Sequence, residues 1–450
     1  MNSTAAVPRL RRVLTLWDLI FYGIVLIMPI APIPLFGIAQ KLSHGHFVTT
    51  ILVAMVAMLF TAASYGRMAA LYPAAGSAYT YVGRGLHPHL GFLAGWAMFL
   101  DYLIQPLFNS ILGALTIQRF FPHIPYAVLA ALFVGTMTFL NVRGIRTTAR
   151  ANIVMLAIMG VVIAAFVVLA TRYLLHYEGW PGLVSLQPFY DPKTFDFRAT
   201  WTATSFAALT YIGFDGVTTL AEEVENPKRN VLLATVLVCV FTGVLAGLQA
   251  YLGQRVWPDY TTFTSLETAF MDISRRVGGA ALFQALGIIL IIACVGAGLT
   301  GQVGAARLLF GMGRDNVLPR RVFGRLDPKR QSPTLNICLI GIVAYVGALL
   351  VTYEQAGEVL NFGAFLAFMG VNLAAFRQFT ILHPPGRKRR WFRDTLMPLL
   401  GFAFCLWIWL GLKTPAKVIG GIWFLIGLTY CAVKTRGFRV RPIEIDFSEG

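Results

Sequence analysis

The stretch Met28-Pro29-Ile30-Ala31-Pro32-Ile33-Pro34 interrupts the first long apolar run of the chain. Each proline lacks a backbone N–H and clashes with the preceding helical turn, so a continuous helix is excluded here. Counted from Trp17, Met28 lies ~16 Å along a helix with a rise of 1.5 Å per residue, close to the middle of a bilayer. Backbone N–H and C=O groups without hydrogen-bond partners are tolerated at that depth only where they are buried in protein or line a water-filled cavity. The stretch therefore predicts a broken helix lining a cavity, with a simple proline kink as the alternative.

A second interruption lies at Tyr211-Ile212-Gly213-Phe214-Asp215-Gly216, where two glycines and an acid fall within an apolar run. A charged side chain at mid-membrane costs several kcal/mol unless it is paired, protonated or hydrated, so Asp215 is a candidate functional residue. Its alternative role is a cap or hydrogen-bond partner at the break. Interruptions in the first and sixth spans predict two five-helix halves of opposite orientation, with a binding site between them. This arrangement is typical of a secondary transporter.

The composition places the whole chain in a membrane. Hydrophobic residues make up 57% of the 450 positions and charged residues only 13%, about half the usual charged share of a soluble domain. We expect an all-α integral membrane protein with one transmembrane domain over 17–434, between tails at 1–16 and 435–450. Residues 259–276 are either a short amphipathic surface helix or a plain loop. The expected spans form a first half (17–39, 46–71, 90–117, 124–142, 148–174), a second half (199–222, 230–253, 281–312, 333–352, 357–382) and two additional helices (395–412, 416–434).

The net charge of +17 would suggest nucleic acid for a soluble protein, but here it reflects membrane orientation. Alternate connections between the spans hold 27 and 10 of the Lys and Arg residues. Positive residues gather on the cytoplasmic side, so we expect both termini in the cytoplasm and the protein in the plasma membrane. The five cysteines form no CxxC pair, and the only H-x-H, His87 and His89, has no further ligands nearby. We therefore expect no metal, no cofactor and no nucleic-acid partner.

Several motifs resemble the amino acid–polyamine–organocation transporter family. The sixth span continues from Tyr211-Ile212-Gly213-Phe214-Asp215-Gly216-Val217 into Ala221-Glu222-Glu223-Val224-Glu225-Asn226-Pro227. Tyr72-Pro73-Ala74-Ala75-Gly76-Ser77-Ala78-Tyr79 and Arg314-Asp315-Asn316-Val317-Leu318-Pro319 also follow the family pattern in the expected order. The resemblance implies a five-plus-five inverted repeat with two extra helices. It further implies substrate between the broken first and sixth spans, with side chains added from the third, eighth and tenth, and transport by alternating access.

The first span departs from the pattern of the family's amino-acid carriers. Those carriers usually place a glycine-rich stretch there, whose free N–H groups bind the substrate carboxylate. Three of residues 28–34 are prolines, which weakens such an anion site because prolines offer no N–H. Donors remain at Ile30, Ala31 and Ile33.

Asp101, in Leu100-Asp101-Tyr102, lies near mid-depth of the third span. Two acids beside aromatic rings would suit an ammonium group through charge and cation–π contact. A proline-rich first span with Leu-Asp-Tyr in the third resembles the putrescine-importer branch. For Asp101 a structural hydrogen bond is the alternative, and for the aromatics ordinary packing. The expected binding set is Met28, Pro29, Ile30, Ala31, Pro32, Asp101, Trp201, Phe206, Tyr211, Gly213, Phe214 and Asp215.

Proton coupling is expected over sodium coupling. The 298–304 stretch offers a single side-chain hydroxyl, that of Thr300, whereas a sodium site needs several oxygen ligands. Some family members replace sodium with a lysine in the fifth span, but residues 151–171 contain none. The candidate proton carriers are Asp101, Asp215, Glu222 and Glu223. Glu222 is alternatively the partner of Arg67 in a cytoplasmic gate.

The sequence thus predicts proton-coupled transport of a polyamine such as putrescine, or of an amino acid. A neutral or cationic amino acid permease or exchanger is the first alternative. A nutrient sensor that binds a solute but does not transport it is the second alternative. Such sensors often carry long tails for signalling partners, whereas the tails expected here are short. An enzyme is disfavoured because HExxH, GxSxG and P-loop motifs are absent from the sequence. A channel is disfavoured because no selectivity-filter repeat is visible.

Overall fold

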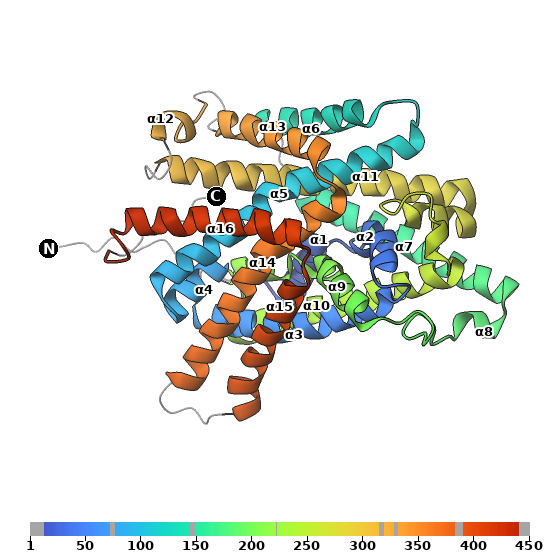
Figure 1. Cartoon of the computed structure of the whole chain (residues 1–450), viewed down its shortest axis with the longest axis horizontal. Helices are drawn as coiled ribbons and strands as arrows, with labels where there is room; N and C mark the ends of the chain where they lie inside the picture. Colours follow the sequence, from blue (N-terminus) through green and yellow to red (C-terminus); the bar gives the residue numbers. More distant parts are fainter. Residues whose placement is uncertain are drawn as a thin grey trace.

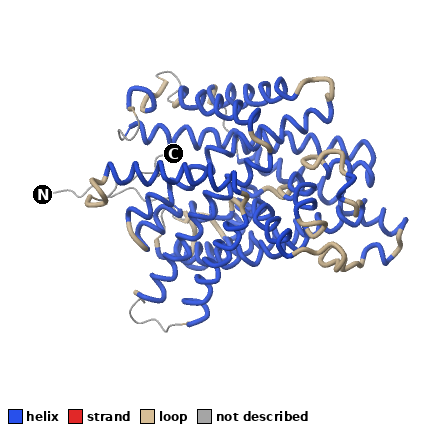
Figure 2. Tube along the Cα trace, in the orientation of Figure 1, coloured by secondary structure: helices blue, strands red, loops and turns tan. Residues whose placement is uncertain are grey.

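The structure is a computed structural model that describes residues 13–72, 77–144, 149–221, 223–314, 319–327, 332–382 and 390–440. Throughout these ranges the chain forms helices joined by loops, with no strand (Figure 2). The fold is therefore all-helical, as predicted.

The first half of the chain contains two short helices in place of its first span. Its elements are α1 (Leu16–Ile27), α2 (Pro32–Leu42), α3 (Phe47–Leu71), α4 (Ser77–Gly85), α5 (Pro88–Phe120), α6 (Tyr126–Val142), α7 (Ala149–Tyr177) and α8 (Trp180–Leu183). Figure 1 shows α5, α6 and α11 lying roughly along the long axis of the molecule.

The second half begins with the other interrupted segment and ends with the two additional helices. Its elements are α9 (Phe197–Ala207), η1 (Ala208–Tyr211), η2 (Phe214–Leu220), α10 (Pro227–Val256), η3 (Tyr260–Thr262), α11 (Ala269–Arg314), α12 (Arg320–Phe323), α13 (Thr334–Leu350), α14 (Tyr353–Phe376), the π-helical turns η4 (Arg377–Ile381) and η5 (Phe392–Leu396), α15 (Met397–Gly411) and α16 (Thr414–Lys434). Among the described residues, 8 helices are long and apolar enough to cross a membrane, and the bent pair α1–α2 makes up to 9. Two shorter apolar helices, α6 and α13, and the interrupted α9–η2 segment accompany them.

The first break is real but shorter than the proline stretch. The axes of α1 and α2 differ by 56°, and Met28 between them has φ +64°, outside the helical region. Pro32 and Pro34 lie in the first turn of α2, where the backbone N–H groups have no helical acceptor and proline is therefore tolerated. The carbonyl of Pro29 is not left open, because Gln249 Nε2 on α10 donates to it at 3.0 Å.

The second break is centred on Gly213. Its φ of +112° lies in the region that only glycine adopts without strain. Beyond it the chain does not return to an α-helix but runs as the 3₁₀ segment η2. The hydroxyls of Thr218 and Thr219 donate to the carbonyls of Asp215 and Gly216 at 2.6 and 2.7 Å, so carbonyl groups freed by the break find local donors.

Two elements differ from the sequence expectation. Helix α4 begins at Ser77, within the Tyr72–Tyr79 motif, and was not predicted. It is short and contains glycines, which hide a helical pattern. Helix α11 begins at Ala269, well before the expected start at 281, and bends at Gly279, whose φ is +64°. The 259–276 segment is therefore a loop with one short 3₁₀ turn, followed by the first turns of a membrane helix.

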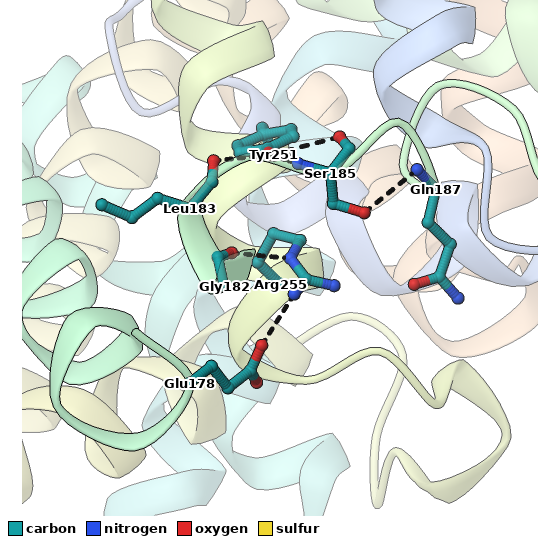
Figure 3. A network of polar contacts seen from close by, with 7 residues as sticks. All are labelled: Glu178, Gly182, Leu183, Ser185, Gln187, Tyr251 and Arg255. Atoms are coloured by element: carbon teal, nitrogen blue, oxygen red, sulfur yellow. Dashed lines mark hydrogen bonds and ion pairs between the residues drawn. The ribbon is translucent and has the colours of Figure 1, made fainter. Parts of the chain in front are cut away.

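Hydrogen bonds and an ion pair hold the loop after α7 against the end of α10 (Figure 3). Tyr251 Oη donates to the carbonyl of Leu183 at 2.7 Å, and Arg255 pairs with Glu178 at 2.7 Å. Ser185 N–H donates back to Tyr251 Oη at 2.9 Å. Side chains of α10 therefore hold the loop that follows α7 in place.

Candidate functional site

A cavity of about 130 Å³ lies between the two breaks. It could hold several water molecules, each occupying about 30 Å³ in the liquid. Side chains and backbone from both broken segments, α5, α11 and α14 form its wall. The lining residues are Leu26, Ile27, Met28, Ile30, Ala31, Pro34, Leu35, Asp101, Gln105, Phe108, Asn109, Leu112, Leu209, Ile212, Leu290, Ala293, Cys294, Ala297, Tyr353 and Leu360.

Helix α5 supplies the polar side of this cavity. Asp101, Gln105 and Asn109 follow at intervals of four residues, so they lie on one face of the helix. Asn109 Nδ2 donates to the carbonyl of Gln105 at 2.8 Å, which ties its side chain to the helix backbone. Within the described part of the chain, no hydrogen bond or ion pair engages the Asp101 carboxyl group. A carboxyl on a mostly apolar wall is therefore free to receive a cationic group.

Two aromatic residues close the cavity between α5 and α14. The rings of Phe108 and Tyr353 stack with centroids 4.2 Å apart and an interplanar angle of 16°. Gly357, one turn after Tyr353, lets Leu209 and Phe108 approach, since a Cβ there would lie 2.6 Å from Leu209 Cδ1. The apolar part of the wall is thus closely packed.

The first break offers fewer donors than expected. Ala31 N–H donates to the carbonyl of Met28 at 2.9 Å, and Ile33 N–H donates to that of Ile30 at 3.0 Å. Of the three donors named from the sequence, only the Ile30 N–H has no acceptor in the described structure. An anion site at this break would rest on that single group.

The predicted aromatic residues pack elsewhere. Trp201 Nε1 donates to the carbonyl of Trp407 at 2.7 Å, and its ring stacks on Trp407. Tyr211 Oη donates to the carbonyl of Ile51 at 2.8 Å. Phe206, Phe214 and Tyr211 are fully buried, and they lie outside the cavity lining, as do Pro29, Pro32 and Gly213. A role for these six residues and Trp201 in binding stays a prediction.

Asp215 is buried in η2, with 8% of its surface exposed, and it is not part of the lining. Of the two acids, only Asp101 lies on the cavity wall. Glu222 lies outside the described residues, so its pairing with Arg67 stays a prediction. Glu223 accepts backbone bonds from Val13 and Leu14 through its carbonyl.

Arg67 is buried on α3 and pairs with Asp394 of η5 at 2.5 Å. Its guanidinium also donates to the carbonyl of Arg393 and stacks over the ring of Phe379, 3.8 Å from the centroid. Asp394, a residue that sequence reasoning did not select, in turn accepts from the backbone N–H of Arg390 at 2.8 Å. The pair joins α3 to the start of the α15 span.

Other site residues were also missed from the sequence. Gln105 and Asn109 carried a signal, because they repeat the four-residue spacing from Asp101. Phe108, Tyr353, Leu209 and Ile212 carried none, since apolar and aromatic residues occur throughout the spans. Among the described residues, no group of three or more His, Cys, Asp or Glu is placed to hold a metal ion.

Comparison with known proteins agrees with this architecture. The amino acid permease family model matches residues 18–432. The low-affinity putrescine importer PlaP of Escherichia coli (strain K12) is 32% identical over 96% of this chain and 95% of its own. The branched-chain amino acid permease BcaP of Lactococcus lactis is 25% identical over 93% of both chains. The methylthioribose transporter of Bacillus subtilis is 24% identical over 95% of this chain and 94% of its own.

Fold, cavity and matches together define a multi-pass membrane permease. The chain belongs to the amino acid permease family. Its relatives are named as importers, permeases and transporters of different solutes. Family membership therefore indicates a transporter but does not identify its solute.

Proposed function

We propose that this protein is a secondary transporter that carries a small amine, such as the polyamine putrescine, by alternating access. The observation that carries the proposal is the Asp101 carboxyl, which lies on the cavity wall between two broken helices and has no hydrogen-bond or ion-pair partner among the residues that the structure describes. A buried carboxylate is costly unless a cation or proton neutralises it. An ammonium group would do so.

The similarity to PlaP favours the same class of solute. Gln105 and Asn109 offer amide oxygens as further acceptors for N–H groups. The rings of Phe108 and Tyr353 provide the apolar contact that an alkyl chain between two amines needs.

Transport of an amino acid is the second candidate. The Ile30 N–H, which has no acceptor among the described residues, points to it, because a free backbone donor at a helix break can bind a carboxylate. Asp101 would then bind the α-amino group. The similarity to BcaP is in line with this alternative.

We further propose proton coupling, with Asp101 or Asp215 as the carrier, and a plasma-membrane orientation with both termini in the cytoplasm. Emptying the site would leave the Asp101 carboxyl in a poorly solvated cavity, and a proton would neutralise it during the return step. Glu222 and Glu223 are alternative carriers. The Arg67–Asp394 pair is proposed as part of a cytoplasmic gate, because it joins α3 to the α15 span near the helix ends that would face the cytoplasm in the proposed orientation.

Uptake by purified protein in proteoliposomes tests the solute. We expect labelled putrescine to enter when an inward proton gradient is imposed without sodium, and unlabelled putrescine to compete better than arginine or leucine. Asp101→Asn should reduce uptake at least about tenfold, since hydrogen bonds to charged groups contribute ~1.5–3 kcal/mol. The matched control is Asp259→Asn, an exposed acid in a loop.

Three outcomes separate the candidates. Normal putrescine uptake by Asp101→Asn would refute the amine proposal. Stronger competition by an amino acid than by putrescine would favour the second candidate. Binding of solute without uptake under any imposed gradient would identify a non-transporting sensor.

A further inference from the structure

A second pocket lies at the C-terminal end of α5. It is open, has a volume of about 530 Å³, and is lined by Arg119, Trp257, Thr264, Asp272, Arg275 and Arg276. Arg119 comes from the last turn of α5, Trp257 directly follows α10, and the other four residues lie on and before the first turns of α11. None of these residues takes part in the cavity around Asp101.

The pocket has an excess of positive charge. It holds three arginines and one acid. Asp272 pairs with Arg119 through one carboxylate oxygen and accepts from Thr264 Oγ1 through the other, at 2.9 Å. Arg275 and Arg276 are exposed, and no carboxylate in the described part of the chain forms an ion pair with either. Two guanidinium groups are therefore left for an anion.

Aromatic rings hold these guanidinium groups in place. Arg276 lies over the ring of Trp257, 5.2 Å from its centroid, and donates to the carbonyl of Val256 at 3.3 Å. Arg275 lies 4.9 Å from the centroid of Phe283, and Arg119 lies 5.9 Å from the same ring. Trp257 is itself fixed, since its Nε1 donates to Thr262 Oγ1 at 2.8 Å. Arginines ordered in this way lose less side-chain entropy when they bind a ligand.

The position of the pocket indicates the source of the anion. Helix α5 has 33 residues, so it is ~50 Å long and extends beyond the ~30 Å hydrocarbon layer into the headgroup region. Tryptophan is typical of that boundary. His89 at the start of α5 lies beside Val440, near the end of the described chain, so the arginines lie at the far side of the bundle. That is the side with few basic residues, where arginines do not serve to set orientation.

We propose that this pocket binds a phosphate group. The planar guanidinium donates two parallel hydrogen bonds to phosphate oxygens, a geometry that Arg275 and Arg276 both leave available. An anionic phospholipid headgroup at the membrane boundary and free inorganic phosphate present the same oxygens. The position of the pocket at the membrane boundary favours the lipid headgroup as the ligand.

The test uses the full-length protein with Arg275→Gln/Arg276→Gln. The matched control is Lys193→Gln/Arg198→Gln, which removes two exposed positive charges, one from the loop before α9 and one from the first turn of α9. Native mass spectrometry would count phosphatidylglycerol and phosphatidylcholine molecules retained from mixed nanodiscs. A parallel arm would measure the Tm in detergent during a titration with inorganic phosphate.

We expect wild type and control to retain phosphatidylglycerol over phosphatidylcholine, and the arginine variant to retain it about tenfold less, as loss of charge-assisted bonds implies. A Tm increase with inorganic phosphate in wild type and control, lost in the arginine variant, would identify free phosphate as the ligand of the same site. Equal lipid retention and equal phosphate response in all three proteins would overturn the proposal. Monodisperse elution and an unchanged Tm without ligand show that the variant is folded.

Discussion

The α-carbon of Gly213 faces the carbonyl of Leu26, and a Cβ built at this glycine would lie 3.4 Å from that oxygen. The next residue of α1, Ile27, is equally close, with its Cγ1 at 3.5 Å. The break in the sixth span therefore packs directly on the end of the first helix. Two interruptions that are far apart in the sequence form one wall of a single cavity.

Gly213→Ala should destabilise the protein. Space for the methyl group is available at 3.4 Å, so the cost arises from the φ of +112°, which an L-residue adopts at about 1–3 kcal/mol. Thermal unfolding in detergent would show a lower Tm. Gly135→Ala is the control, because no heavy atom lies within 4 Å of its Cβ position and its φ is ordinary. Equal Tm values for the two variants would contradict a strained break at Gly213.

Gly301→Ala should weaken solute binding. Its Cβ would lie 2.6 Å from Gln105 Oε1 and 3.0 Å from Gln105 Cβ, so the added methyl must displace a side chain of the cavity wall. Such overpacking costs about 1–3 kcal/mol of folding stability. A displaced Gln105 would also lose its hydrogen bond to the solute, about 0.5–1.5 kcal/mol, which corresponds to a reduction in affinity of about two- to tenfold. Uptake at varied solute concentration would measure it. Gly296→Ala on the same helix meets nothing closer than Met155 Cε at 3.5 Å and should behave as wild type; a matching loss there would assign the effect to α11 in general.

Asp394→Asn should lower stability far more than loss of an exposed pair. Arg67 and Asp394 are 5% and 1% exposed, and removing one partner of a buried pair costs about 3–5 kcal/mol. Glu354→Gln is the comparison, because its partner Lys413 is 39% exposed and such pairs contribute only about 0–1 kcal/mol. The two Tm values measure the difference. A smaller Tm decrease for Asp394→Asn than for Glu354→Gln would show that the buried pair does not stabilise the α3 contact.

Gln249→Leu should destabilise the first break. The variant keeps a similar volume but removes the donor to the Pro29 carbonyl, and a buried carbonyl without a partner costs about 1–3 kcal/mol. We expect a lower Tm together with slower uptake, because Met28, Ile30 and Ala31, on either side of Pro29, line the cavity. Gln187→Leu, on an exposed loop, is the control. Unchanged Tm and uptake in Gln249→Leu would mean that the break does not need this support.

The breaks were predictable because their causes are local. Three prolines remove three backbone donors wherever they occur, and glycine is the residue that permits a positive φ. The extent of the first break was not predictable, since Pro32 and Pro34 are compatible with the first turn of a helix as well as with a gap. Only the observed start of α2 distinguishes the two.

The cavity wall was predictable only in part. Met28, Ile30, Ala31 and Asp101 were expected there and line it. Asp215 was selected on the same grounds as Asp101, namely an acid at mid-depth, yet it is buried outside the lining. Depth along a helix follows from residue counting, whereas the direction of a side chain around the axis depends on the neighbouring helices.

The amino-acid sequence by itself determined the all-helical membrane class, the two breaks and the family, because these depend on composition, local backbone chemistry and motif order. The tertiary structure alone decided which polar groups remain open and which are paired. Arg67 meets an acid 327 positions away, and Gln249 meets a carbonyl 220 positions away. No local rule brings such groups together; helix packing does, and it leaves the carboxyl of Asp101 facing the cavity.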